Sequence, residues 1–316
     1  MSKPLPQKYR TINWRDYNQS LKQRGSMLLW IDKEMDWLAP GSGKRGREEK
    51  FSDAAIQFCQ MVKNLFGLAL RQACGMVASL LKLSGLDWPT PDYTTLCRRQ
   101  QRLQVCISYR ANPNGLHLLV YSTGVKMVGE GEWKAKKHGA EYRRQWRKVH
   151  LGIDNLKVTS AETLEIRAIE VTSNRVGDAQ VLPDLLAQIP ADEMIASVSG
   201  DGAYDTKGSH KAIAERRADA VIPVRKNGKP WKENTLGAKV RNDTLRATQR
   251  LGRTLWKKWS GYHRRSLVEA KMRCFKLLGE RVKARLFNSQ VAELQIRAAL
   301  LNRFTQLGTP ITVAIP

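Results

Sequence analysis

The order of apolar patterns along the chain constrains its fold more than any other feature. From Phe51 to about Arg110 the apolar residues recur at helical spacing. After residues 113–115, short apolar runs follow one another and then alternate with helical segments. Strands followed by alternating strands and helices indicate a mixed α/β sheet with flanking helices. The sequence therefore predicts an α/β domain preceded by a mainly helical region.

These patterns divide the chain into four parts. Residues 1–50 are predicted to form an irregular basic arm that ends in a flexible linker. Residues 51–112 form the helical region, and residues 113–305 form the α/β domain. A loop or insertion is expected around 225–260, because its first part is rich in Lys, Gly, Pro and Asn. Residues 306–316 form a C-terminal tail.

The net charge of +25 points to a polyanionic partner. A surplus this large repels itself unless a polyanion neutralises it, and nucleic acid is the usual one. Lys and Arg are spread along the chain instead of clustering beside an apolar helix, which favours nucleic acid over a membrane surface. Charge alone does not separate DNA from RNA, or a binding protein from an enzyme.

Three further features of the sequence bear on its location. No uninterrupted apolar run is long enough to span a bilayer, and Met1 to Arg10 lacks the apolar core of a secretory signal. The five cysteines are odd in number and widely spaced, which argues against a disulfide frame or a zinc knuckle. We therefore expect reduced thiols and a cytoplasmic protein that binds no membrane.

Short helices in the helical region suit a DNA-binding domain. Ser52 can cap the first helix, and Thr90, followed by Pro91 and Asp92, can start the last one. That last helix carries arginines that we assign to DNA contact, namely Arg98, Arg99 and Arg102. The pattern is typical of a helix-turn-helix. An ordinary helical subdomain with a solvated basic face is the alternative.

Asp201 is the first candidate for chemistry. It follows the predicted strand at residues 195–199 and lies in the segment Gly-Asp-Gly-Ala-Tyr-Asp at residues 200–205. Folds of the α/β class place reacting groups at the carboxyl ends of strands. The small neighbours leave room for a metal ion and a phosphate. A polar turn after a strand would be the alternative if Asp201 stood alone.

A second candidate site lies at a helix that is predicted from about Ser266 to Leu278. Tyr262, Arg265, Glu269 and Lys276 have offsets of three, four and seven residues. At about 100° per residue they would lie within roughly 60° of one helical face. This arrangement suits a glutamate that holds a metal ion while the arginine and the lysine grip phosphates.

These segments resemble the DDE transposases of bacterial insertion sequences. The spacing Tyr-x2-Arg-x3-Glu-x6-Lys from Tyr262 matches the signature around their catalytic glutamate, and residues 200–205 resemble the block around their second aspartate. Residues 122–150 are similar to the insertion-sequence-five family, through Ser-Thr-Gly at 122–124, Gly-Glu-Gly-Glu-Trp at 129–133 and the Trp-Arg-Lys before His150. The resemblance covers roughly residues 50–300.

The resemblance implies a ribonuclease-H-like catalytic fold with an N-terminal DNA-binding region. It also implies two divalent ions held by three carboxylates, with Asp201 and Glu269 as catalytic residues and metal ligands. Hard oxygen ligands suit Mg²⁺, with Mn²⁺ as the other candidate. The implied activity is cleavage and strand transfer at transposon ends by in-line phosphoryl displacement. Double-stranded DNA is the implied partner, bound by a homodimer or a higher oligomer.

Tyr121 departs from the family pattern. It stands after the apolar strand and before Ser-Thr-Gly, where the family has its first catalytic aspartate. A phenol is larger than a carboxylate and supplies little ligand charge to an ion. The chain is inactivated, or another acid replaces the missing one, or the protein has a non-catalytic role or a deliberately altered sequence. The candidate replacement acids are Asp154, Glu130 and Glu132.

A basic hairpin region is predicted at residues 129–139. Basic residues within it and shortly after it are expected to line a path for DNA near the active site. They are Lys134, Lys136, Lys137, Arg143, Arg144, Arg147 and Lys148. A merely solvated hairpin is the alternative.

The leading hypothesis for function is a transposase that acts on terminal inverted repeats. The second is a transposase-derived protein that binds repeat ends without cutting them, and the third is an RNA-binding protein without nuclease ancestry.

Overall fold

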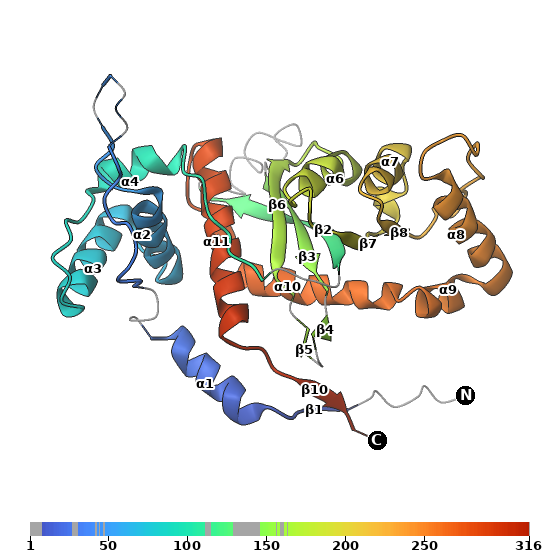
Figure 1. The fold of residues 1–316 in the computed structure, drawn as a ribbon, viewed down its shortest axis with the longest axis horizontal. Helices are drawn as coiled ribbons and strands as arrows, with labels where there is room; N and C mark the ends of the chain where they lie inside the picture. The colour runs from blue at the N-terminus through green and yellow to red at the C-terminus, as the bar shows by residue number, and fades with distance from the viewer. Residues whose placement is uncertain are drawn as a thin grey trace, which may run out of the picture.

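The computed structural model of the chain describes residues 8–26, 31–41, 43, 45–46, 48–110, 115–128, 146–155, 157–158, 161–162 and 164–315. A helical region lies at one side of a central sheet, and the last long helix runs between them (Figure 1). Among the described residues, no single helix is long and apolar enough to cross a bilayer, although one bent helix pair, at residues 53–65 and 70–83, passes that test when taken together.

The central sheet has six strands and is mixed. Its main path is β6 (Ile166–Ser173), β3 (Trp146–Asp154), β2 (Leu116–Met127), β7 (Ile195–Ser199) and β8 (Asp219–Val221). Strand β3 is antiparallel to β2 and β6, whereas β7 is parallel to both β2 and β8. The short strand β9 (Arg281–Val282) pairs with the far end of β2. A separate two-stranded ribbon consists of β4 (Lys157–Val158) and β5 (Ala161–Glu162).

Helices cover both faces of this sheet, and β2 therefore contributes buried residues to a core on each side. Leu118 and Val120 pack against α6 (Asp178–Ala187) and α7 (Lys207–Glu215). Leu119 and Tyr121 point to the opposite face, which packs against α10 (Ser266–Leu277) and α11 (Phe287–Leu307). The alternation follows from the two-residue period of a strand. The predicted mixed α/β fold is confirmed and is consistent with a ribonuclease-H-like architecture.

The helical region shares its core with the end of the chain. It consists of α2 (Asp53–Leu65), α3 (Leu70–Leu83) and α4 (Tyr93–Gln100). Ile296 and Leu300 of α11 belong to the same buried cluster. Ser52 caps α2 as predicted, through a bond from the Ala55 amide to its hydroxyl. The expected start of the last helix at Thr90 is wrong: Asp92 is the cap, because its carboxylate accepts the amide hydrogens at the start of α4.

The prediction of an irregular N-terminal arm is also wrong. Helix α1 (Trp14–Arg24) follows strand β1 (Tyr9–Thr11), and β1 pairs antiparallel with β10 (Thr312–Ala314) in the C-terminal tail. Arg24 donates to the carbonyl of Gly308 at 2.8 Å and lies over the ring of Phe304. The arm is therefore ordered by partners at the other end of the sequence, which no local pattern reveals.

The predicted loop around 225–260 is irregular only in its first part. Helix α8 (Ala238–Leu251) begins after Gly237, and α9 (Arg253–Trp259) follows it. Gly252 separates the two helices with a φ of 81°, a left-handed conformation that favours glycine. The Lys- and Gly-rich composition of the first part concealed these helices.

Candidate active site

Tyr121 and Asp201 lie at equivalent positions of neighbouring parallel strands, Tyr121 within β2 and Asp201 just after the end of β7. The register of β2 and β7 pairs Leu119 with Ser199, and both candidate residues lie two positions further along. Gly200 allows the close approach, since a Cβ atom there would lie 2.8 Å from the Tyr204 ring and 3.1 Å from Val120. The carboxyl ends of neighbouring parallel strands are where α/β folds build their sites.

Asp201 is fixed by a local hydrogen bond. Its Oδ1 accepts the amide hydrogen of Ala203 at 2.8 Å, which caps the short 3₁₀ turn η2 (Gly202–Tyr204). The residue is only partly buried. Its other carboxylate oxygen therefore remains a candidate for ligand contact.

Glu269 enters the site from helix α10, where it forms an ion pair with Arg265 at 3.1 Å. The Arg265 side chain is only 19% exposed, whereas that of Glu269 is 52% exposed. The guanidinium carbon of Arg265 lies 5.5 Å from the Tyr121 ring centroid and 5.8 Å from that of Tyr262. Arg265 thus joins the strand carrying Tyr121 to the helix carrying Glu269.

The expectation that Tyr262, Arg265, Glu269 and Lys276 lie on one continuous helix is wrong. Helix α10 begins at Ser266, and residues 262–265 form the separate 3₁₀ turn η3 (Tyr262–Arg265). The turn nevertheless brings the arginine to within reach of the glutamate one helical turn later. Spacing identified the right neighbours but not the break between them.

The side chain of Tyr262 lies near both candidate carboxylates, Asp201 and Glu269. Burial raises the pKa of Tyr262, the nearby Arg265 guanidinium opposes that change, and the carboxylates of Asp201 and Glu269 raise it further. Tyr262 is therefore within electrostatic range of both acids, which are 68 positions apart in the sequence. The structure brings both predicted acids to the region of Tyr121.

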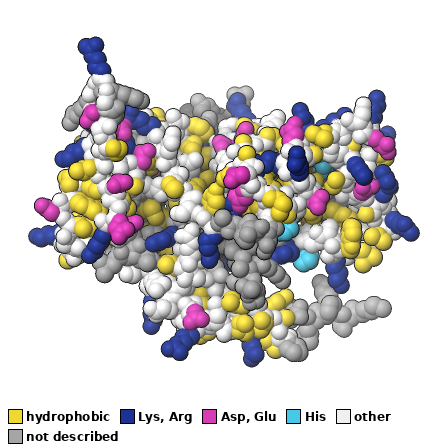
Figure 2. Space-filling view, in the orientation of Figure 1, with side chains coloured by type: hydrophobic (Ala, Val, Ile, Leu, Met, Phe, Trp, Pro, Cys, Tyr) yellow, Lys and Arg dark blue, Asp and Glu magenta, His cyan; other side chains and the backbone are white. Residues whose placement is uncertain are grey.

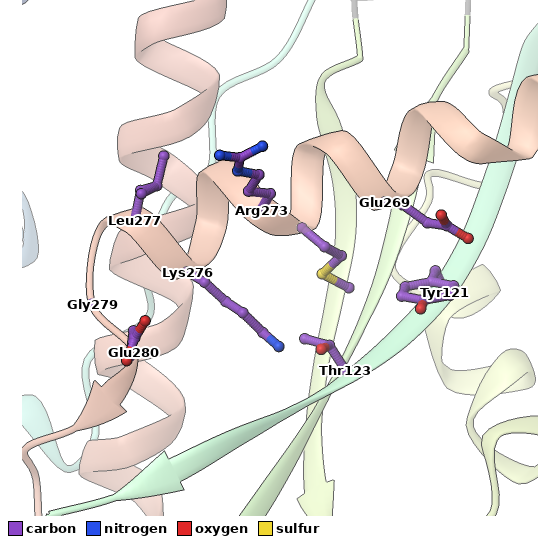
Figure 3. Close-up of a pocket in the computed structure, with 9 residues that line it drawn as sticks. Tyr121, Thr123, Glu269, Arg273, Lys276, Leu277, Gly279 and Glu280 are labelled. Carbon is purple, nitrogen blue, oxygen red and sulfur yellow. The ribbon is translucent and has the colours of Figure 1, made fainter.

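A cavity of about 620 Å³ opens beside Tyr121 and Glu269. Figure 3 shows these two side chains next to each other, with Lys276 directed toward Thr123 of the same strand. Arg273 and Glu280 also line the cavity, together with Met272, Leu277 and Gly279. A volume of this size fits a ligand-binding pocket, and its charged lining combines the cations Arg273 and Lys276 with the carboxylates Glu269 and Glu280.

Asp154 does not fit the role of a replacement acid at this site. It pairs in register with Leu118, and directly opposed residues of neighbouring strands share one face of a sheet. Leu118 packs toward α6, whereas Tyr121 faces α10. Asp154 is also buried, with its carboxylate 3.9 Å from Arg167. The other two candidate acids, Glu130 and Glu132, lie outside the described residues.

The predicted DNA-contacting residues of the hairpin region fall into two groups. Lys134, Lys136, Lys137, Arg143 and Arg144 lie outside the described residues. Arg147 and Lys148 belong to β3 and have partners within the protein. Arg147 donates to Gln290 at 2.6 Å, and Lys148 pairs with Asp178 at 2.6 Å. Figure 2 shows Lys and Arg side chains scattered over one face of the molecule, without a single dominant patch.

The arginines of α4 differ sharply in their surroundings. Arg99 is buried. It binds the backbone carbonyl of Phe51 and the side-chain carboxylates of Asp53 and Glu49, at 2.7–2.9 Å. Arg102 is 69% exposed and pairs with Glu49 at 3.1 Å. Arg98 is exposed and bonds only within its own helix in the described part of the chain. Arg99 therefore holds α4 against Glu49 and the start of α2, while the other two arginines are accessible to a ligand.

Sequence reasoning missed a buried ion pair behind Asp201. Arg241 of α8 binds Asp205 at 3.0 Å and stacks on Trp231, with 4.3 Å between its guanidinium carbon and the ring centroid. Burial acts to raise the pKa of Asp205, but the His210 ring 3.5 Å away, together with hydrogen bonds from Arg241 and the Arg225 amide, holds it well below its usual range. The only sequence signal was the position of Asp205 in the same short block as Asp201.

The mixed sheet, with acidic and cationic side chains gathered at one edge, is consistent with the ribonuclease-H-like class of proteins that act on nucleic acids. Two protein-family models, both described as transposase DDE domain, match the chain at residues 22–130 and 113–303. The second match alone covers more than half of the 316 residues, so the chain belongs to the transposase DDE domain family. No solved structure matches the chain significantly.

Members of this family are generally phosphoryl-transfer enzymes that bind DNA and use divalent metal ions. The residues at this site do not fit a pair of such ions. Two carboxylates are present, one of them is paired with Arg265, and a phenol takes the third position. Within the described ranges, no group of three His, Cys, Asp or Glu side chains is placed to hold an ion. Tyr121 is thus the point at which the chain and the chemistry of its family disagree.

Proposed function

We propose that this protein is a transposase of the insertion-sequence-five type that binds the terminal inverted repeats of its element as double-stranded DNA. In this proposal it acts in the bacterial cytoplasm, on the nucleoid, as a homodimer or a higher oligomer. The family match, the net charge of +25 and the accessible Arg98 and Arg102 support DNA binding.

We further propose that strand cleavage and strand transfer are impaired in this chain. The observation that carries this proposal is the place of Tyr121, beside the strand end that leads to Asp201 and within contact of Arg265, the partner of Glu269. An uncharged phenol cannot supply the negative charge that a third carboxylate would bring to Mg²⁺ or Mn²⁺. Asp201 and Glu269 remain the proposed catalytic and metal-binding residues of a site in which an aspartate replaces Tyr121.

A second candidate function is a transposase-derived protein that recognises repeat ends and protects or occupies them without cutting. The Arg265–Glu269 ion pair favours it, because that pair already balances one of the two remaining carboxylates. Both functions share the same DNA ligand and differ only in chemistry. The proposed DNA path includes Tyr262, Arg265 and Lys276, with the basic residues at 134–148.

The test combines a gel shift and a cleavage assay on the same DNA. The probe is a duplex that carries the inverted repeat flanking the gene, and a scrambled duplex of equal length and composition is the control. We expect a specific complex and little or no nicking with Mg²⁺. Efficient nicking by the unaltered chain would refute the impairment, and equal affinity for the scrambled duplex would refute repeat recognition.

A further inference from the structure

Another cavity, of about 250 Å³, lies between the segment that follows β8 and helix α9. It adjoins the candidate active site, because Gly202, the residue after Asp201, belongs to its lining. Among the described residues, the charged side chains that line it are all cationic, namely Arg225, Lys226, Arg253 and Lys257. The cavity beside Tyr121, in contrast, is lined by two carboxylates as well as two cations. The cavity at α9, here the α9 pocket, therefore suits an anionic ligand.

The partners of these cations within the described part of the chain are neutral. Arg225 donates to the carbonyls of Gly202 and Ala203 at 3.0 and 3.2 Å. Arg253 donates to the carbonyl of Val224 at 2.6 Å. These hydrogen bonds hold both guanidinium groups in place and leave their positive charge uncompensated. All four cations belong to exposed residues, so a ligand can reach them.

The α9 pocket belongs to a strongly basic segment. Residues 225–258 contain eleven Lys or Arg but only two acidic residues. Of the two acids, Asp243 pairs with Arg246. Of the basic residues, only Arg241 is buried, and it binds Asp205. The segment thus carries nine of the 25 net positive charges on 34 of the 316 residues, which favours a polyanion as its ligand.

The position of the α9 pocket indicates which DNA it can reach. Helices α4 and α9 lie toward opposite ends of the long axis of the molecule, with α10 and β7 between them (Figure 1). Helix α10 carries Glu269, and β7 leads to Asp201. A duplex that extends from α4 past these two acids therefore arrives at α9. Contacts to phosphates position DNA without reading its sequence, so the pocket suits DNA of any sequence.

We propose that the α9 pocket binds backbone phosphates of the DNA that flanks the element, whatever its sequence. In this arrangement the repeat lies on the side of α4 and the flank on the side of α9. The junction between repeat and flank then lies near Asp201 and Glu269. This inference rests on the proposed recognition of terminal repeats and adds a second DNA segment to that complex.

The test measures how much flanking DNA adds to the affinity for the repeat. Fluorescence anisotropy compares three labelled duplexes at constant ionic strength: the repeat alone, the repeat extended on its flank side, and the repeat extended on its internal side. Each extension has about ten base pairs, one turn of the duplex. We expect the flank extension to lower the dissociation constant about tenfold, whatever its sequence, and the internal extension to change it less than about twofold.

Single substitutions in α9 separate the pocket from the general positive charge. Arg253→Gln and Lys257→Gln should each reduce the gain from the flank to about threefold and lower the salt dependence by about one counterion. Neither should change binding to the repeat alone. Lys258→Gln is the matched control, because Lys258 is an exposed lysine of the same helix that lies outside the pocket lining. Melting temperatures verify that each variant is folded.

The outcomes separate this inference from the function on which it rests. Failure to bind any of the three duplexes, or equal affinity for a scrambled repeat, would remove both. Repeat-specific binding without a gain from the flank would overturn the α9 pocket and leave repeat recognition standing. Equal losses for Lys257→Gln and Lys258→Gln would also overturn it, because they would assign the gain to charge in general.

Discussion

Arg241 binds Asp205 inside the protein, with 3.0 Å between the Nε and Oδ1 atoms and both side chains nearly inaccessible to solvent. The pair connects the block that contains Asp201 to α8, a helix that the sequence did not predict. Since Asp205 follows Asp201 by four positions, the ion pair helps to fix the candidate active site from behind.

Breaking this pair should destabilise the protein strongly. Arg241→Ala leaves a buried carboxylate without its cation, and such changes cost about 3–5 kcal/mol. The measurement is urea denaturation followed by circular dichroism. Arg246→Ala, in the same helix, breaks an exposed pair with Asp243 and should cost about 0–1 kcal/mol. Equal losses for both variants would show that the buried pair has no special role.

A buried histidine should make stability fall at mildly acidic pH. Burial is the main reason that the pKa of His150 is lowered to about 4, with Asp178 opposing and Lys148 adding to the shift. The unfolded chain binds this proton below about pH 6.5 and the folded chain does not. The contribution of His150 to stability is therefore complete above about pH 6.5 and decreases as the pH falls toward 4.

This effect is measured as unfolding free energy at pH 7 and pH 5. His150→Asn should reduce the difference between the two values, which amounts to at most about 2 kcal/mol from this group. His263→Asn, at an exposed position, is the control and should leave the difference unchanged. If the two variants show the same pH dependence as the unaltered chain, His150 is not the source of that dependence.

The two exposed arginines of the helical region should contribute to DNA affinity. Arg98→Gln and Arg102→Gln are each expected to weaken binding at all sequences and to lower the salt dependence by about one counterion. Arg99→Gln should instead destabilise the fold, because the Arg99 guanidinium is buried and binds Glu49, Asp53 and the carbonyl of Phe51. Anisotropy titrations at several salt concentrations give the first effect, and denaturation gives the second. Unchanged affinity and salt dependence for both exposed variants would exclude α4 from the DNA path.

Sequence patterns predicted the elements whose information is local. Helix α10 was expected from about Ser266 to Leu278 and runs from Ser266 to Leu277. The strand before Asp201 lies where its apolar run placed it. In both cases burial of one face leaves a regular apolar period in the sequence, so the period suffices to locate the element.

What the sequence could not predict depends on distant partners. Helix α1 has few apolar residues, but the strand before it, β1, pairs with β10, and the helix itself contacts α11. The Asp205–Arg241 pair joins residues 36 positions apart, and Arg241 follows a segment whose Lys, Gly and Pro residues resemble a loop. At the site itself, spacing identified Arg265 and Glu269 as neighbours. It could not show that Arg265 would also contact the ring of Tyr121.

The most direct test of the central claim is metal-dependent cleavage by Tyr121→Asp. The assay follows nicking of the labelled repeat duplex with Mg²⁺, with Tyr121→Asn as the matched control, since asparagine has the size of aspartate but no charge. We expect Tyr121→Asp to raise the cleavage rate over the unaltered chain by at least about 100-fold, and Tyr121→Asn to leave it low. Equal rates for the unaltered chain and Tyr121→Asp, with both proteins folded and bound to DNA, would contradict the account.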